Sequence, residues 1–205
     1  SRVIATNAKD SVIYTKGHGS EAIVAQSIAG GGGTTGSAKG ILVAGAYKGG
    51  AGNASTVKVK NEGVLITEGD HSATIVAQSI SGGGGLTSGL DNISSYTVLG
   101  GQEETGNSGA VDVENSNILY TAGTLSSAII AQSISGGGGI TGLTHELSFG
   151  NTGMSNASAT SGKVDLKNTG SITTEGNGAI AVVSQSIGGG GGYTAGVDQG
   201  EAPTN

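Results

Sequence analysis

The sequence has no cysteine or tryptophan, only one proline, and aromatic residues make up 3% of its 205 residues. The lack of cysteine excludes a disulfide framework and thiolate chemistry. Large aromatic and aliphatic side chains usually fill a three-dimensional core, so this chain must build a thin core from small and β-branched residues. Such a composition is typical of a narrow solenoid rather than of a globule.

Charge is also scarce, because charged residues make up 12% of the chain and the net charge is −6. No run of lysine or arginine occurs, which argues against a nucleic-acid partner or binding to an anionic membrane. There is no apolar run of 18 residues and no basic segment followed by an apolar one at the start. We therefore expect no membrane insertion of this segment and no export signal of its own, so that an exported protein would be longer.

Glycine is abundant, with 42 residues, yet hydrophobic residues still account for 35% of the chain. The glycines do not recur at every third position, which excludes a collagen helix. A disordered chain would lack the periodic apolar segments found here.

One stretch occurs four times, an apolar segment that ends in Gln-Ser-Ile and leads into a run of glycines. The copies cover residues 22–33, 74–85, 128–139 and 181–192. Their glutamines are Gln26, Gln78, Gln132 and Gln185, which are 52, 54 and 53 residues apart. A self-similar period near fifty indicates a repeat architecture, in which a single copy is not a domain.

A second repeated element precedes each glutamine motif and reads Val-x-Val-x-Asn-x-Gly-x-Ile-x-Thr in outline. Its copies cover 57–67, 111–121 and 164–174, with a degenerate copy from Val3, and its asparagines are Asn7, Asn61, Asn115 and Asn168. Alternation places Val57 and Val59 inward and Lys58 and Lys60 outward on a strand. The Asn-x-Gly step predicts a corner at which asparagine and glycine accept positive φ.

Three strands follow one another within about 24 residues without a hairpin signal, which favours one coil of a parallel β-helix. The variable segments 34–56, 86–110 and 140–163 each contain one more strand, at 40–44, 95–99 and 146–149. We interpret these segments as a second coil, so that each repeat makes two coils of about 26 residues. Three coils of about 18 residues fit equally well. Eight coils would make a rod roughly 40 Å long.

Together the two motifs resemble the repeats in passenger regions of large Gram-negative autotransporter proteins, the type V secretion class, from Val3 to about Gly196. The resemblance implies a right-handed parallel β-helix, displayed outside the cell by a C-terminal outer-membrane β-barrel, with roles in adhesion, self-association or biofilm. No signal peptide, barrel strands or protease or esterase insertion is recognised in the chain. The resemblance therefore supports a fold and a location more than a particular ligand.

The sequence thus predicts an all-β, right-handed parallel β-helix (solenoid) built from about four repeats of about 53 residues. We expect a single elongated domain over 1–205. The repeats are a partial one at 1–33, then 34–85, 86–139 and 140–192, with a tail at 193–205.

No catalytic, cofactor or metal site is expected. The glycine runs lack the following Lys-Ser/Thr of a phosphate-binding loop and the aspartate of calcium-binding nonapeptides, so we interpret them as tight corners and places where backbones stack closely. His18, His71 and His145 do not share a repeated position and are interpreted as turn residues. The serines repeat because the structure repeats, and no Gly-x-Ser-x-Gly motif occurs.

The repeated amides are predicted to be structural. Stacked asparagine and glutamine side chains can donate and accept hydrogen bonds along the axis, and we expect such ladders at the four glutamines and the four asparagines. The strand that carries glutamine is apolar on both faces, so the direction of the glutamine stays open. If both faces are buried, either the glycine-rich segment folds back over one of them or another chain covers it.

We expect an extracellular structural and adhesive region, on the surface of a Gram-negative bacterium and attached to its outer membrane, that mediates adhesion or self-association. Its expected partners are further repeats of the same protein, a C-terminal barrel, other copies of itself, and a host or matrix glycan or protein. The alternatives are a subunit of an extracellular filament and, less favoured, a polysaccharide-acting enzyme on the same scaffold. Exposed strand edges predict association of the isolated chain end to end or side by side.

Overall fold

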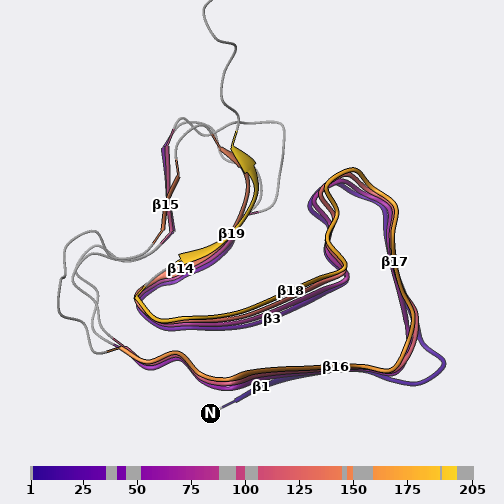
Figure 1. Cartoon of the computed structure of the whole chain (residues 1–205), viewed down its shortest axis with the longest axis horizontal. Helices are drawn as coiled ribbons and strands as arrows, with labels where there is room; N and C mark the ends of the chain where they lie inside the picture. The colour runs from indigo at the N-terminus through magenta and orange to yellow at the C-terminus, as the bar shows by residue number, and fades with distance from the viewer. Residues whose placement is uncertain are drawn as a thin grey trace, which may run out of the picture.

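The computed structural model describes residues 2–35, 41–44, 52–87, 96–99, 106–144, 147–149, 159–189 and 191–197, and all regular structure in these residues is β-strand. The strands form five parallel sheets. Four of the sheets hold four strands each, and every sheet takes one strand from each repeat that contributes to it. The fold is therefore the predicted all-β parallel β-helix of repeated units (Figure 1).

The strands are grouped here by sheet. Sheet A contains β1 (Val3–Asn7), β6 (Val57–Asn61), β11 (Val111–Asn115) and β16 (Val164–Asn168). Sheet B contains β2 (Val12–Thr15), β7 (Val64–Thr67), β12 (Leu119–Thr121) and β17 (Ile172–Thr174). Sheet C contains β3 (Ile23–Ile28), β8 (Ile75–Ile80), β13 (Ile129–Ile134) and β18 (Val182–Ile187). Sheet D contains β4 (Gly32–Thr35), β9 (Gly84–Thr87), β14 (Gly138–Thr144) and β19 (Gly191–Val197). Sheet E contains β5 (Ile41–Ala44), β10 (Tyr96–Leu99) and β15 (Leu147–Phe149).

Each repeat makes one coil, so the prediction of two coils was wrong, as was the alternative of three. Every strand pairs with the equivalent strand of the next repeat: Val3 lies beside Val57, and Ile75 lies beside Ile129. The strands expected in the variable segments do form, but they stack on one another as sheet E instead of starting a second coil. Four coils span roughly 20 Å rather than 40 Å. The stacking axis lies along the view of Figure 1, which is the shortest axis of the molecule, so the domain is not elongated along it.

Sheets A and C lie face to face, and sheet B joins them at one end (Figure 1). The inward residues of these three sheets form one apolar core, which includes Val57, Val59, Leu65, Ile75 and Ile129. On β6 the two valines are fully buried while Lys58 and Lys60 are only partly so, which confirms the predicted alternation. A thin core of branched aliphatic residues is therefore sufficient, because each coil is sealed by the coils above and below it.

Sheet C is buried on its second face by the glycine-rich segment, which folds back as sheet D. Val76 and Ile130 on sheet C pack against Leu86, Ile140 and Tyr193 on sheet D. The hydroxyls of Ser127 and Tyr193 lie 3.3 Å apart across this layer. Of the two predicted ways of covering this face, the chain uses its own glycine-rich segment. β19 continues to Val197, so residues 193–197 of the predicted tail belong to a strand of sheet D, and residues 198–205 lie outside the described part.

The glycine runs stack backbone on backbone, as the sequence indicated. Gly84 adopts φ of +133°, and a Cβ atom there would collide with the carbonyl of Gly138 in the next coil. Gly138 has φ of +149° and meets Gly191 in the same way. Both the backbone conformation and the lack of space require glycine at this turn into sheet D.

The predicted positive φ at the Asn-x-Gly corner is wrong. Asn61 is the last residue of strand β6, and neither it nor Gly63 has a positive φ. Glycine is needed at position 63 because a Cβ atom would meet Ser11 and the amide of Asn7 at 2.5 Å. Among the described non-glycine residues, positive φ occurs at Asp10, His71 and Leu125.

Candidate functional site

The outer face of sheet A carries two columns of charged side chains. One column is Lys58, Asp112 and Asp165, and the other is Lys60, Glu114 and Lys167, on β6, β11 and β16 in that order. We call these six residues the charged face. They point outward because the residues between them are the valines and leucine of the core. Of these six residues, only Lys58 and Lys60 were predicted to point outward.

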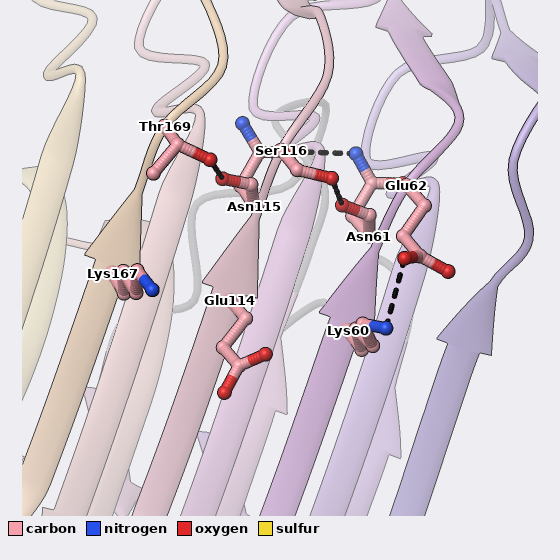
Figure 2. Close-up of a pocket in the computed structure, with 8 residues that line it drawn as sticks. All are labelled: Lys60, Asn61, Glu62, Glu114, Asn115, Ser116, Lys167 and Thr169. Atoms are coloured by element: carbon pink, nitrogen blue, oxygen red, sulfur yellow. Dashed lines mark hydrogen bonds and ion pairs between the residues drawn. The ribbon is translucent and has the colours of Figure 1, made fainter.

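A shallow hollow lies at the end of the charged face, where sheet A turns its corner. Figure 2 shows Lys60, Glu114 and Lys167 side by side on three neighbouring strands, with Glu62 reaching down from the corner. Lys60 Nζ lies 2.8 Å from Glu62 Oε1, and Lys58 Nζ lies 3.8 Å from Glu114 Oε1. Lys167 forms no ion pair with the part of the chain that the structure describes. The hydrogen bond to Glu62 raises the pKa of Lys60.

The side chains of the charged face are open to solvent. The side chains of Lys58 and Glu114 are 42% and 47% exposed, so water screens their charges. Acid–base catalysis by carboxyl groups relies on buried sites that separate their pKa values. Among the described residues, no group of three or more His, Cys, Asp or Glu side chains is placed to hold a metal ion.

The four asparagines form a continuous ladder along the corner between sheets A and B. The amide nitrogen of each donates to the side-chain oxygen of the next, at 2.8, 2.7 and 2.6 Å from Asn7 to Asn168. The same nitrogen of Asn61 also donates to the carbonyl of Gly63, and that of Asn115 to the carbonyl of Asn117. The amides of Asn61 and Asn115 thus tie one coil to the next and also hold their own corners.

The four glutamines form a second ladder on sheet C. Their side chains donate from each coil to the next at 2.5, 2.8 and 2.6 Å, and those of Gln78 and Gln132 are fully buried. Side chains alternate between the two faces of a strand, so Gln78 points to the same side of β8 as Val76 and Ile80. This is the face that sheet D covers. These amides satisfy one another inside the protein, and they are structural in this geometry rather than open to a ligand.

His18 and His71 lie in the same turn of neighbouring coils. His18 Nδ1 lies 3.7 Å from Asp70 Oδ2 at the surface of the turn between sheets B and C. His71 occupies the same turn in the next coil with φ of +55°, and both of its buried ring nitrogens lack a hydrogen-bond partner. Burial lowers the pKa of His71. His145 lies outside the described residues.

Sequence reasoning missed Glu21, which lies near the same turn. Its carboxyl group is largely removed from water, and this burial raises its pKa to about 7. The equivalent residue in the next coil, Ala73, belongs to the apolar cluster between sheets C and D. No repeat signal marks Glu21, because the other copies have different residues at this position.

Sequence reasoning also missed the outer face of sheet B. Val12, Tyr14 and Ile118 are 63%, 46% and 47% exposed, although they belong to regular strands or adjoin them. The signal was present in the run Val64-Leu65-Ile66, which is apolar at successive positions and therefore on both faces of its strand. This surface is the second candidate for contact with a partner.

Comparisons with family models, with curated proteins and with solved structures gave no match to this chain. The resemblance to autotransporter passenger repeats therefore stays a prediction. In the described part of the chain, no helix has the length and apolar character needed to cross a membrane. The fold itself is identified from its own geometry, as a parallel β-helix with one repeat in each coil.

Proposed function

We propose that this chain is a structural and adhesive region of a surface-displayed bacterial protein of the autotransporter type. The observation that carries the proposal is the in-register stacking of four near-identical coils. This stacking buries both faces of sheet C and leaves sheets A and B with ordered outward rows of side chains. A scaffold of this kind repeats the same weak contact at regular intervals, which suits adhesion or self-association.

The buried ladders support a mechanical role. Every coil is tied to its neighbours by backbone pairing in each sheet and by asparagine and glutamine side chains that hydrogen bond along the axis. Such networks rigidify a structure when every member is satisfied. A rigid array of this kind would keep the outward faces flat and evenly spaced.

The charged face gives little support to the enzyme alternative. Its carboxylates, Asp112, Glu114 and Asp165, are interspersed with three lysines on an open sheet rather than converging in a cleft. The extracellular location and the attachment to the outer membrane are part of the same proposal, supported by the resemblance of the repeats and by a chain without cysteine. Further repeats and a C-terminal barrel in the full-length protein are proposed on the same grounds.

The experiment is to coat inert beads with the chain and to measure their retention on protein- and glycan-coated surfaces, as well as their clumping. The matched control is Ile75→Asp, which places a charge in the core and should prevent folding while leaving the amino-acid residues of both outer faces unchanged. The proposal predicts that beads with the native chain are retained or clump, whereas control beads are not. A folded chain that shows neither behaviour would contradict it.

A further inference from the structure

The outer face of sheet B is apolar, unlike that of sheet A. Alternate residues of its strands point outward, and these residues line up in two adjacent columns across the four coils. We call this set the apolar face, and it consists of Val12, Val64, Ile118 and Ser171 in one column and Tyr14, Ile66, Tyr120 and Thr173 in the other. In a chain that puts lysine and acidic residues on the outer face of sheet A, this surface is an exception.

A row of three charged residues and one alanine borders the apolar face on one side. Moving through the coils from the first to the last, this border reads Lys16, Glu68, Ala122 and Glu175. Lys16 lies over the ring of Tyr14, with 5.0 Å from Nζ to the ring centroid, and Glu175 Oε2 accepts a hydrogen bond of 2.7 Å from Tyr120. These contacts place the border residues on the same side of the sheet as the apolar face. Lys16 Nζ also lies 3.8 Å from Glu68 Oε2 in the next coil, and the two side chains are 69% and 45% exposed. The one cation of the border is therefore in the first coil, and Glu175, a carboxylate without a cationic partner among the described residues, is in the last.

We propose that the apolar face binds the apolar face of a second copy of this chain. The two copies are related by a twofold axis that lies in the interface, runs parallel to the strands of sheet B and passes between β7 and β12. This axis reverses the order of the coils and keeps the columns aligned. Ile66 then meets Tyr120 of the second copy, and Val64 meets its Ile118. At the border, Lys16 of each copy meets Glu175 of the other, and Glu68 meets Ala122.

The charges select this arrangement over the other face-to-face pairing. The alternative is a twofold axis parallel to the solenoid, which would preserve the order of the coils and reverse the columns. It places Lys16 over Val12 of the second copy, so that Lys16 keeps only Glu68 of its own chain as a partner and gains no carboxylate from the second copy. The chosen axis instead gives two equivalent pairs of opposite charge. It also sets the first-coil corner, residues 8–11, against Thr169 and Gly170, which are small. That corner projects beyond sheet B in Figure 1, so it needs space on the opposing copy.

The proposed contact is weak in a single pair of molecules. Four strands about 4.8 Å apart and about five residues long present roughly 300 Å² per copy. Stable specific interfaces bury about 800 Å² per partner. The contact therefore depends on many copies acting together, as on a cell surface. This inference rests on the proposed adhesive function and specifies its partner as a second copy.

The test uses beads that carry the chain and two charge reversals, Lys16→Glu and Glu175→Lys. Beads with either variant alone should clump at least roughly fivefold less than native beads at low ionic strength, because both border pairs become repulsive. A mixture of the two kinds of bead should regain clumping, with each bead binding the other kind. The reversed charge at position 16 of one variant then meets the reversed charge at position 175 of the other, so that the pair is again of opposite sign. A matched control is Lys163→Glu, which reverses an exposed charge away from sheet B and should leave clumping unchanged.

The mixture separates the inference from the proposed function. Restored binding between the two variants supports the twofold arrangement, and folding is verified by the same result. Variants that clump as well as native beads, or a mixture that fails to recover, overturn it. Native beads that do not clump also overturn it, while retention of those beads on coated surfaces would leave the adhesive function standing with a different partner.

Discussion

Thr67 and Thr121 occupy the same position in consecutive coils but differ in their hydrogen bonding. Both side chains are fully buried. Thr67 Oγ1 donates to the carbonyl of Ser72 at 2.7 Å, whereas Thr121 Oγ1 has no partner. A buried hydroxyl without a partner keeps its desolvation cost and gains nothing in return.

This difference predicts opposite effects for one substitution. Thr121→Val should raise the free energy of unfolding by about 1 kcal/mol, because a methyl group replaces an unsatisfied hydroxyl. Thr67→Val should lower it by about 1 kcal/mol, because the carbonyl of Ser72 loses its donor. Urea denaturation of both variants checks the prediction, and shifts of the same sign in both would contradict it.

Glu21 makes the stability depend on pH. Burial raises its pKa from 4.5 to about 7, so the folded state holds a proton that the unfolded state releases. Its contribution to stability is therefore fully present below pH 4.5 and is lost as the pH rises through about 7. Glu21→Gln should match the native chain at pH 4 and be more stable than it at pH 8.

The measurement is the difference in the free energy of unfolding between the native chain and Glu21→Gln at each pH. His71 is present in both chains, so its contribution cancels in this difference. On its own, the lowered pKa of His71 acts in the opposite direction, because it reduces stability as the pH falls below 6.5. A difference that does not change between pH 4 and pH 8 would show that Glu21 is in contact with water.

At the scale of the strand, alternation decides which substitutions the chain tolerates. Ile75 is fully buried in the core between sheets A and C, and Ile75→Asp should unfold the chain because the charge has no partner there. Lys58 points outward, and Lys58→Ser should change the free energy of unfolding by about 0.5 kcal/mol or less. Circular dichroism and denaturant titration distinguish the two, and equal costs would contradict the assignment of the faces.

Much of each strand could be predicted from the sequence, because Val57 and Lys58 alternate visibly and the motifs repeat in register. The strands of sheet D could not, since Gly84 and Gly85 have low strand propensity and enter a sheet only because the coils stack closely. The ladder positions were visible as repeated amides. The direction of Gln78 was not, because both faces of its strand are apolar and only the folded chain shows sheet D above it.

The corner after sheet A shows why local rules were insufficient. Asn and Gly suggested positive φ, but Gly63 is required by the approach of Ser11 from the neighbouring coil. The composition of the outer faces could not be predicted either, because neighbours on the charged face, such as Lys58 and Asp112, are far apart in the sequence. Such neighbours become visible only once the number of coils in each repeat is known.

At the scale of the whole molecule, one repeat in each coil is the central claim, since it fixes every neighbour described above. It gives wide coils, a short stack and outward columns in which residues 52 to 54 positions apart are adjacent. With two coils in each repeat, the same residues would be about 9.6 Å apart along the axis.

Disulfide formation between engineered cysteines tests this claim most directly, because the chain has no cysteine of its own. Lys58 and Asp112 are paired neighbours on adjacent strands, whereas Lys58 and Asp165 are separated by one intervening strand. Cysteines can bridge only when their Cα atoms are within about 7 Å. The account predicts that K58C/D112C forms an intramolecular disulfide on mild oxidation and that K58C/D165C does not. Failure of K58C/D112C to bridge in a folded chain would contradict it.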